Sequence, residues 1–305
     1  MTKEKAHCGV VVPMVSPMTP EGTIDIESTE RLVDHLAKRE VGIFVLGTTG
    51  EAASLDHHER LRLVKAAIQS AADRVPVYAG ISDNSIVRSI DSAREYFQCG
   101  ADACVAHLPS YYKLTEREML VYFQKLHEGV KGPLILYNIP QTTQMSLPVG
   151  LISELAHLPR IVGIKDSERD IERMHKTAEL FAGREDFKLY MGSAILAVRA
   201  LQCGFNGLVP STGNLLPGYW RDLVRAARAG QWETARDLQK KLDAINLVFQ
   251  DGNSLGQSLW SLKVALNAES LCRPHVGIPL LPLTEEEARK VCDRVASLLL
   301  PASSV

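Results

Sequence analysis

The sequence of 305 residues lacks the features that would assign it to several common functional classes. No apolar run approaches the ~20 residues that a membrane-spanning helix needs, and the charged segment 1–7 lacks the apolar core of a secretory signal. A formal net charge of -2 gives no reason to expect a nucleic acid or an anionic membrane as partner. We therefore expect a cytoplasmic protein that acts on small molecules.

The six cysteines include no CxxC pair, and most of them lie inside apolar segments. A free thiol packs in such a segment as a small hydrophobic side chain. We therefore expect free, buried thiols, as is usual in a reducing compartment.

What the sequence has instead is a regular alternation of short apolar segments with amphipathic helical segments. The expected strands are 9–14, 41–46, 75–81, 101–108, 133–137, the start of 161–167, 187–191 and 207–210. Alternation of this kind predicts βαβ units on a parallel sheet, and eight closed units form a (β/α)8 TIM barrel. An open doubly wound sheet is the alternative, but its glycine-rich phosphate turn is replaced here by Val15-Ser16-Pro17-Met18.

After about residue 217 only helical patterns remain. They cover 219–229, 232–249, 255–266 and 285–300. No linker, repeat or low-complexity tract separates them from the rest of the chain. We therefore expect two parts, a barrel with the catalytic site at residues 1–217 and a C-terminal helical extension packed on it at residues 218–305.

The segment IVGIKDS at 161–167 places a lysine at the end of a short β-branched run that is typical of a buried strand. Apolar surroundings desolvate an ammonium group and disfavour its charged form. A neutral lysine amine is a nucleophile towards a carbonyl carbon. The alternative is that Lys165 simply ends the strand and extends its amine into water.

Polar residues gather at the expected carboxyl ends of the strands, where a barrel of this kind carries its active site. In strand order from the second to the eighth they are Thr48, Thr49, Glu51, Tyr111, Tyr112, Tyr137, Asn138, Lys165, Asp166, Ser167, Gly192, Ser193, Ser211 and Asn214. Each residue taken singly is commonly a turn or packing residue. Their joint placement indicates a site.

These side chains suit Schiff-base chemistry on a 2-keto acid. The amine of Lys165 would attack the keto carbon and lose water, and the resulting iminium would accept electrons released at the adjacent carbon. Tyr137 is the nearest proton-transferring hydroxyl by strand order. The hydroxyls and backbone N–H groups of Thr48 and Thr49, in a glycine-flanked loop, suit the keto-acid carboxylate.

Two other barrel chemistries fit the sequence less well. A metal-dependent aldolase needs His and carboxylate ligands at the strand ends, whereas only His107 falls in an expected strand, and we interpret it as a core or rim residue. A phosphate-binding barrel needs glycine-rich loops after strands seven and eight. The segment 204–207 is glycine-rich but precedes strand eight.

Three segments resemble the signature motifs of the dihydrodipicolinate synthase/N-acetylneuraminate lyase family in order and spacing. They are GTTGE at 47–51, YNIP at 137–140 and GIKD at 163–166, and the resemblance covers nearly the whole chain. It implies a (β/α)8 barrel that forms a Schiff base with pyruvate or a related 2-keto acid. It further implies no metal, no cofactor besides the covalent lysine link, and a homotetramer built as a dimer of dimers.

The resemblance also implies roles for single residues. Lys165 matches the Schiff-base lysine, Tyr137 the proton-transferring tyrosine, and Thr48 the hydroxyl that relays protons. Thr49 and Gly50 match the site of the keto-acid carboxylate, with the backbone of Val209 beside it. Tyr111, with Tyr112 as the alternative, matches the tyrosine that crosses into the neighbouring subunit's site.

One departure from the family pattern concerns the second substrate. True dihydrodipicolinate synthases carry an arginine two residues after the proline of the tyrosine motif, and here that position is Thr142. A neutral hydroxyl cannot form the bidentate ion pair that arginine forms with a carboxylate. The hydroxyls of Ser167, Ser193 and Ser211 suit a polyhydroxylated substrate.

We therefore expect a Schiff-base aldolase or lyase that forms or cleaves a C–C bond between pyruvate and an aldehyde, with a sugar-acid type substrate. The alternative within the family is 4-hydroxy-tetrahydrodipicolinate synthase, which condenses pyruvate with aspartate semialdehyde. A non-catalytic protein that binds 2-keto acids is the alternative from another class. The intact lysine and tyrosine favour an enzyme.

Overall fold

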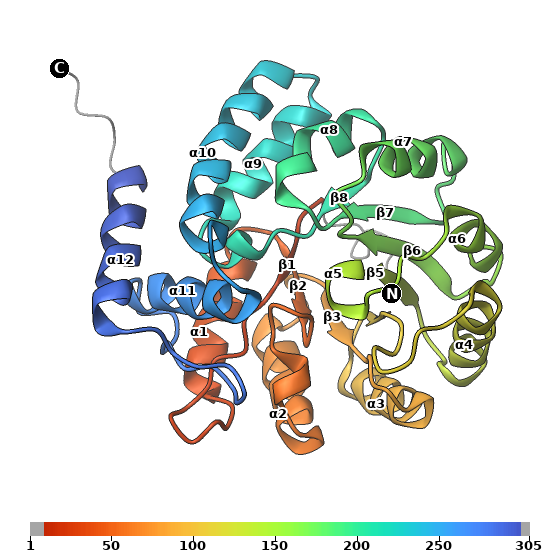
Figure 1. Ribbon diagram of the computed structural model, residues 1–305, viewed down its shortest axis with the longest axis horizontal. Helices are drawn as coiled ribbons and strands as arrows, with labels where there is room; N and C mark the ends of the chain where they lie inside the picture. The colour runs from red at the N-terminus through yellow and green to blue at the C-terminus, as the bar shows by residue number, and fades with distance from the viewer. Residues whose placement is uncertain (1–8, 300–305) are drawn as a thin grey trace.

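The protein is a barrel of eight parallel strands surrounded by helices, as the computed structural model of residues 9–299 shows (Figure 1). Neighbouring strands pair in the order β1 to β8, and a parallel bridge between Val10 and Leu208 closes the ring. The expected (β/α)8 barrel is confirmed. The strands are β1 (Val11–Pro13), β2 (Gly42–Val45), β3 (Val77–Gly80), β4 (Ala103–Ala106), β5 (Leu134–Asn138), β6 (Ile161–Asp166), β7 (Lys188–Met191) and β8 (Gly207–Leu208).

Several barrel helices begin where the sequence supplies a capping side chain. Asp25, Asp56 and Asp170 each accept a hydrogen bond from the backbone N–H three residues later. Thr115 and Glu118 form a reciprocal capping box. The barrel helices are α1 (Ile26–Ala37), α2 (His57–Ala71), α3 (Ile86–Cys99), α4 (Glu116–Gly129), α5 (Pro140–Thr143), α6 (Val149–Leu155), α7 (Ile171–Leu180) and α8 (Ala197–Gln202).

The two strands that close the barrel are shorter than the sequence predicts, since β1 covers 11–13 and β8 covers 207–208. A side chain takes the place of strand pairing beyond them. Asn214 donates a hydrogen bond to the carbonyl of Pro13 and accepts one from the N–H of Val15. The side-chain amide of Asn214 thus satisfies backbone groups at the end of β1. Asn214 is the last residue of a short 3₁₀ helix that follows β8.

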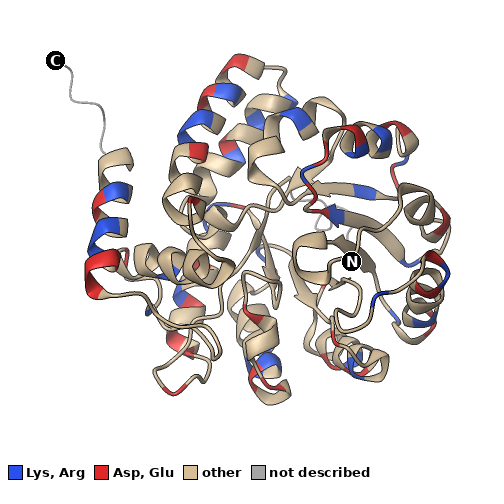
Figure 2. Ribbon diagram, viewed as in Figure 1, with Lys and Arg blue, Asp and Glu red and all other residues tan. Residues whose placement is uncertain are grey.

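Charged residues lie mainly on the outer helices and loops (Figure 2). Apolar side chains pack together in the barrel interior. The interior cluster includes Val11, Phe44, Tyr137 and Val209. Within residues 9–299 no helix is both long enough and apolar enough to cross a membrane.

The expectation of buried thiols is only partly correct. All five cysteines in the described part of the chain are free, but only Cys104 and Cys272 are buried. The other three cysteines are partly exposed. They are Cys99, Cys203 and Cys292. Cys8 lies outside the described residues, as does the segment 1–7 that we compared with a secretory signal.

The expected C-terminal helices are present, and α10 packs along α9 and contacts α8 of the barrel (Figure 1). They are α9 (Pro217–Arg228), α10 (Trp232–Gln250), α11 (Leu255–Ala268) and α12 (Glu285–Leu299). The expected end of the last helix at residue 300 lies outside the described residues. The division of the chain at residue 217 stays a prediction.

A fully buried ion pair joins this extension to the barrel. Lys263 on α11 lies 2.5 Å from Glu51 in the loop after β2, and both side chains are 0% exposed. The Lys263 amine also donates to the carbonyl of His275, and Glu51 accepts a hydrogen bond from the N–H of Gly277. The pair therefore fixes the loop 47–51 against α11.

Replacing Lys263 by Met should lower the free energy of unfolding by about 3–5 kcal/mol, because Glu51 would stay buried without its partner. Urea denaturation measures this change. The double substitution Lys263→Met/Glu51→Gln should recover part of the loss. Lys240→Met, at an exposed side chain of α10, is the control and should change stability by less than about 0.5 kcal/mol. Equal stability of Lys263→Met and the wild type would contradict the prediction.

Candidate active site

The pairing of β5 with β6 brings the expected nucleophile beside the expected proton-transferring hydroxyl. Tyr137 is the register partner of Lys165. The Lys165 amine lies 4.0 Å from the centroid of the Tyr137 ring and 5.2 Å from that of Phe44. Lys165 is only 6% exposed. The lysine is therefore buried, and its amine lies close to two aromatic rings.

The hydroxyl of Tyr137 has polar neighbours from two other strand ends, those of β2 and β6. Burial by itself raises the pKa of this phenol, but the charge of Lys165 and hydrogen bonds with Lys165, Thr48 and Ser167 outweigh burial and lower the pKa of Tyr137 below its usual value. A phenol whose pKa is lowered gives up its proton more readily. Tyr137 is therefore suited to exchange protons with a substrate bound at Lys165.

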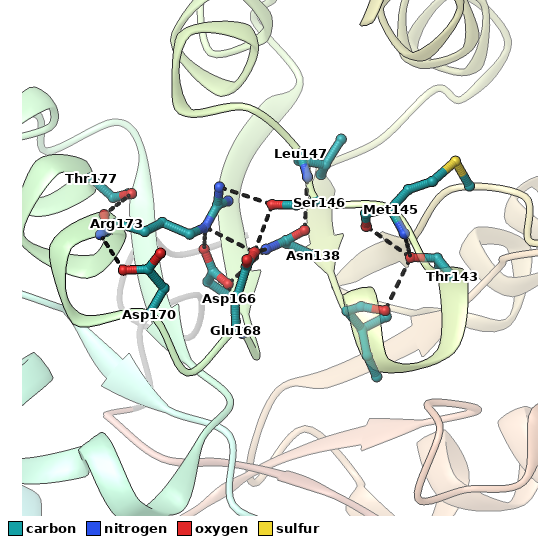
Figure 3. A network of polar contacts seen from close by, with 11 residues as sticks. Asn138, Thr143, Met145, Ser146, Leu147, Asp166, Glu168, Asp170, Arg173 and Thr177 are labelled. Carbon is teal, nitrogen blue, oxygen red and sulfur yellow. Dashed lines mark hydrogen bonds and ion pairs between the residues drawn. The ribbon is translucent and has the colours of Figure 1, made fainter. Parts of the chain in front are cut away.

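A buried polar network cross-links β5 and β6 one residue beyond the tyrosine and the lysine (Figure 3). Asn138 donates hydrogen bonds to Asp166 and Glu168, both at 2.9 Å. Arg173 on α7 donates to Asp166 at 2.8 Å, and Ser146 donates to Glu168 at 2.6 Å. Because these contacts bridge the two strand ends, they hold the reactive pair in register.

Gly192, directly after β7, leaves the space that the lysine side chain occupies. A Cβ atom at this position would overlap the hydroxyl of Ser167 and lie 3.0 Å from Cε of Lys165. No side chain fits there without displacing Lys165 or Ser167. A side chain at position 192 would therefore shift the hydroxyl of Ser167 first and the Lys165 side chain next.

Lys165 lines a cavity of about 550 Å³, which is within the range usual for small-molecule sites. Eight of the side chains expected at the site line this cavity. They are Lys165, Tyr137, Thr48, Thr49, Ser167, Ser193, Val209 and Ser211. Pyruvate is much smaller than this volume, so the cavity has room for a second reactant.

Three of the residues to which we assigned a catalytic or substrate-binding role do not line the cavity that contains Lys165. Thr142 lines a neighbouring cavity of about 470 Å³. Gly50 is buried, and its carbonyl accepts a hydrogen bond from Ser16. Tyr111 is 77% exposed, and its ring packs edge-on against Tyr112.

His107 lines the same neighbouring cavity as Thr142, and its ring centroid lies 6.1 Å from that of Tyr137. Burial lowers the pKa of His107. We interpreted His107 as a core or rim residue, and the structure places it at the wall of this cavity. In the described part of the chain, no group of three or more His, Cys, Asp or Glu side chains is placed to hold a metal ion.

Sequence reasoning missed several residues that support the site. Phe44 is an ordinary apolar strand residue by sequence, and Arg173 is one of many helical arginines. Neither position carries a local signal, because their roles depend on what the folded chain places beside them. Gly192 was expected at the site from its place directly after a strand, but the sequence did not indicate its contact with Lys165 and Ser167.

The family of the chain follows from comparison with known proteins. The model of the dihydrodipicolinate synthetase family matches residues 6–298. The chain belongs to this family. The enzymes of the dihydrodipicolinate synthetase family are class I aldolases that use a covalent Schiff base between lysine and pyruvate, and the resemblance inferred from the three motifs is confirmed.

Relatives within the family carry one recurring name. A 4-hydroxy-tetrahydrodipicolinate synthase of Nitrosospira multiformis is 35% identical over 278 residues, covering 90% of each chain. One of Laribacter hongkongensis is 33% identical and covers 93% of this chain and 96% of the relative. Our expectation of a sugar-acid substrate finds no support among these relatives, whereas the alternative does.

Solved structures of the family share the fold. Dihydrodipicolinate synthase from Bacteroides thetaiotaomicron superposes with a TM-score of 0.91 at 30% identity, covering 95% of this chain and 98% of that chain. YagE, a prophage protein of the dihydrodipicolinic acid synthase family from E. coli K12, was solved in complex with pyruvate. Its TM-score is 0.90 at 27% identity, with the same coverage.

Gly192→Ala should reduce formation of a pyruvate adduct on Lys165 by at least about tenfold, because the added methyl group displaces the lysine or Ser167. Borohydride reduction with pyruvate, followed by peptide mass analysis, measures the adduct. Gly150→Ala on α6 is the matched control, since a Cβ there meets no atom within 4 Å. Wild-type adduct formation in Gly192→Ala would show that the glycine is not required.

Proposed function

We propose that this enzyme forms a Schiff base between Lys165 and pyruvate and joins the bound pyruvate to an aldehyde. The observation that carries the proposal is the enclosed Lys165 amine, 4.0 Å from the ring of Tyr137 and held there by strand register. A desolvated amine with a proton-transferring hydroxyl beside it is suited to covalent catalysis on a carbonyl group.

In the first stage the Lys165 amine attacks the keto carbon of pyruvate. The carbinolamine that forms loses water and becomes an iminium, and Tyr137 delivers the proton that the departing hydroxyl needs. Thr48 lies within hydrogen-bonding reach of Tyr137 and returns that proton from solvent. Thr49 lines the same cavity and binds the keto-acid carboxylate.

In the second stage the iminium nitrogen withdraws electrons from the methyl carbon of pyruvate. A proton leaves that carbon, and the resulting enamine attacks the carbonyl carbon of the aldehyde, whose oxygen takes up a proton. Water then hydrolyses the new iminium, which releases the product and restores the free amine. The same steps in reverse cleave the C–C bond. The scheme needs no cofactor beyond the lysine itself.

The first candidate for the aldehyde is aspartate semialdehyde. It is supported by the relatives named 4-hydroxy-tetrahydrodipicolinate synthase, at 33–35% identity over at least 90% of this chain. The second candidate is an aldehyde derived from a sugar acid. It is supported by the hydroxyls of Ser167, Ser193 and Ser211, which line the cavity.

We further propose a cytoplasmic homotetramer, arranged as a dimer of dimers. The support is Tyr111, which is 77% exposed and lies outside the cavity of its own subunit. An exposed aromatic side chain at a barrel mouth can enter the site of a neighbouring copy. Tyr112, at 71% exposed, is the alternative for the same role.

Borohydride reduction in the presence of pyruvate should give one adduct, located on Lys165 by peptide mass. Lys165→Ala should give no adduct and no turnover, because Lys165 is the only lysine within residues 9–299 that lines this cavity. Lys188→Ala, on the neighbouring strand β7, is the control for general lysine reactivity. An adduct of equal yield in Lys165→Ala would remove the basis of the proposal.

A panel of aldehydes with pyruvate should identify the second reactant. Condensation with aspartate semialdehyde should proceed with a kcat/KM at least about tenfold above that of neutral sugar aldehydes if the first candidate is correct. The disappearance of pyruvate measures condensation, and its release from sugar-derived keto acids measures cleavage. A preference for those sugar-derived keto acids would favour the second candidate.

A further inference from the structure

The cavity at Lys165 extends beyond what pyruvate needs and carries a distinct set of charges in its outer part. Its lining includes the end of α10, the turn after it and the start of α11. Four described lining residues are charged. They are Lys165, Arg169, Asp243 and Asp251. Since Lys165 is consumed by the keto acid, Arg169 is the remaining cation of this lining.

The guanidinium of Arg169 is available for a ligand. It lies in the loop between β6 and α7, four residues after Lys165, and its side chain is exposed. It donates a long hydrogen bond of 3.5 Å to Gln250 at the end of α10. Among the described residues no carboxylate forms an ion pair with it within 4.0 Å, so its charge is not neutralised by the protein.

Arg173, one helical turn later, shows the contrasting case. Its side chain is 10% exposed and forms ion pairs with Asp166 at 2.8 Å and Glu168 at 3.3 Å (Figure 3). Its charge is therefore used inside the protein. Of the two arginines that follow β6, one supports the strands and the other faces the cavity.

The carboxylates of the lining restrict where an anionic group can bind. Asp243 and Asp251 repel a second carboxylate from the parts of the lining that lie directly beside them. Burial raises the pKa of Asp243, and its hydrogen bonds with Gln239 and Asn246 act in the opposite direction. A carboxylate on the aldehyde would therefore bind near Arg169, where the guanidinium offers two parallel N–H donors.

We propose that Arg169 determines specificity by binding a carboxylate on the aldehyde while that aldehyde reacts with pyruvate on Lys165. This inference rests on the proposed function. It predicts that the enzyme prefers aldehydes that carry an acid group to neutral aldehydes. The donor is a side chain from the loop directly after the strand that carries the nucleophile, so one segment of the chain binds both the acid group and the reacting carbonyl.

Two aldehydes of equal chain length test the proposal. Succinic semialdehyde carries a carboxylate, whereas butanal has a methyl group in its place. Arg169→Gln should raise the KM for succinic semialdehyde by about 10–100-fold, which is the usual worth of a charge-assisted hydrogen bond. The KM values for butanal and pyruvate should change by less than about twofold. Arg169→Lys should lie between wild type and Arg169→Gln.

Arg94→Gln, at an exposed arginine of α3 outside the lining, is the matched control and should leave every KM unchanged. An unchanged KM for succinic semialdehyde in Arg169→Gln would overturn the proposal. Equal losses for both aldehydes would also overturn it, because they would indicate a structural role. The pyruvate adduct on Lys165 separates this result from failure of the proposed function, since the adduct should form in wild type and Arg169→Gln alike.

Discussion

The site depends on one register, that of β5 on β6. This pairing sets Tyr137 opposite Lys165, and both side chains point into the barrel among aromatic and apolar neighbours. A shift of the register by one residue would send one of the two side chains to the other face of the sheet. The polar network through Asn138, Asp166 and Arg173 makes such a shift costly, because each of these groups would be left buried without its partner.

The remaining parts of the site are held by elements that are distant in sequence. The loop that carries Thr48 and Thr49 is held in place through Glu51 at its end, whose partner Lys263 belongs to the C-terminal extension. The extension therefore does more than cover the barrel, since it supplies a buried charge to the loop and the end of α10 to the cavity wall. The ion pair is fully buried, and a buried charge is stable only when its partner is in place.

In the function that we propose, the charges of the cavity separate the two reactants. Lys165 is buried in the barrel, whereas Arg169 lies on an exposed loop, where its charge is open to an incoming acid. The hydroxyls of Ser167, Ser193 and Ser211 lie in the same lining and suit polar substituents on the aldehyde. Thr142, where true synthases of the family carry arginine, lines the neighbouring cavity and contributes no charge.

The sequence by itself indicated the barrel, several helix starts and the residues that we expect to react, because alternating apolar periods, capping aspartates and polar residues at strand ends are local signals. Lys165, Tyr137, Thr48 and Thr49 were all found in this way, and they share one cavity lining. Only the tertiary structure showed that Gly192 leaves space for the side chains of Ser167 and Lys165. Only the structure showed that Arg173 forms ion pairs with carboxylates, whereas Arg169 forms none with a described residue. The pairing of Lys263 with Glu51 likewise became visible only in the folded chain. These facts depend on distances between segments far apart in the chain, and no local pattern of residues records such distances.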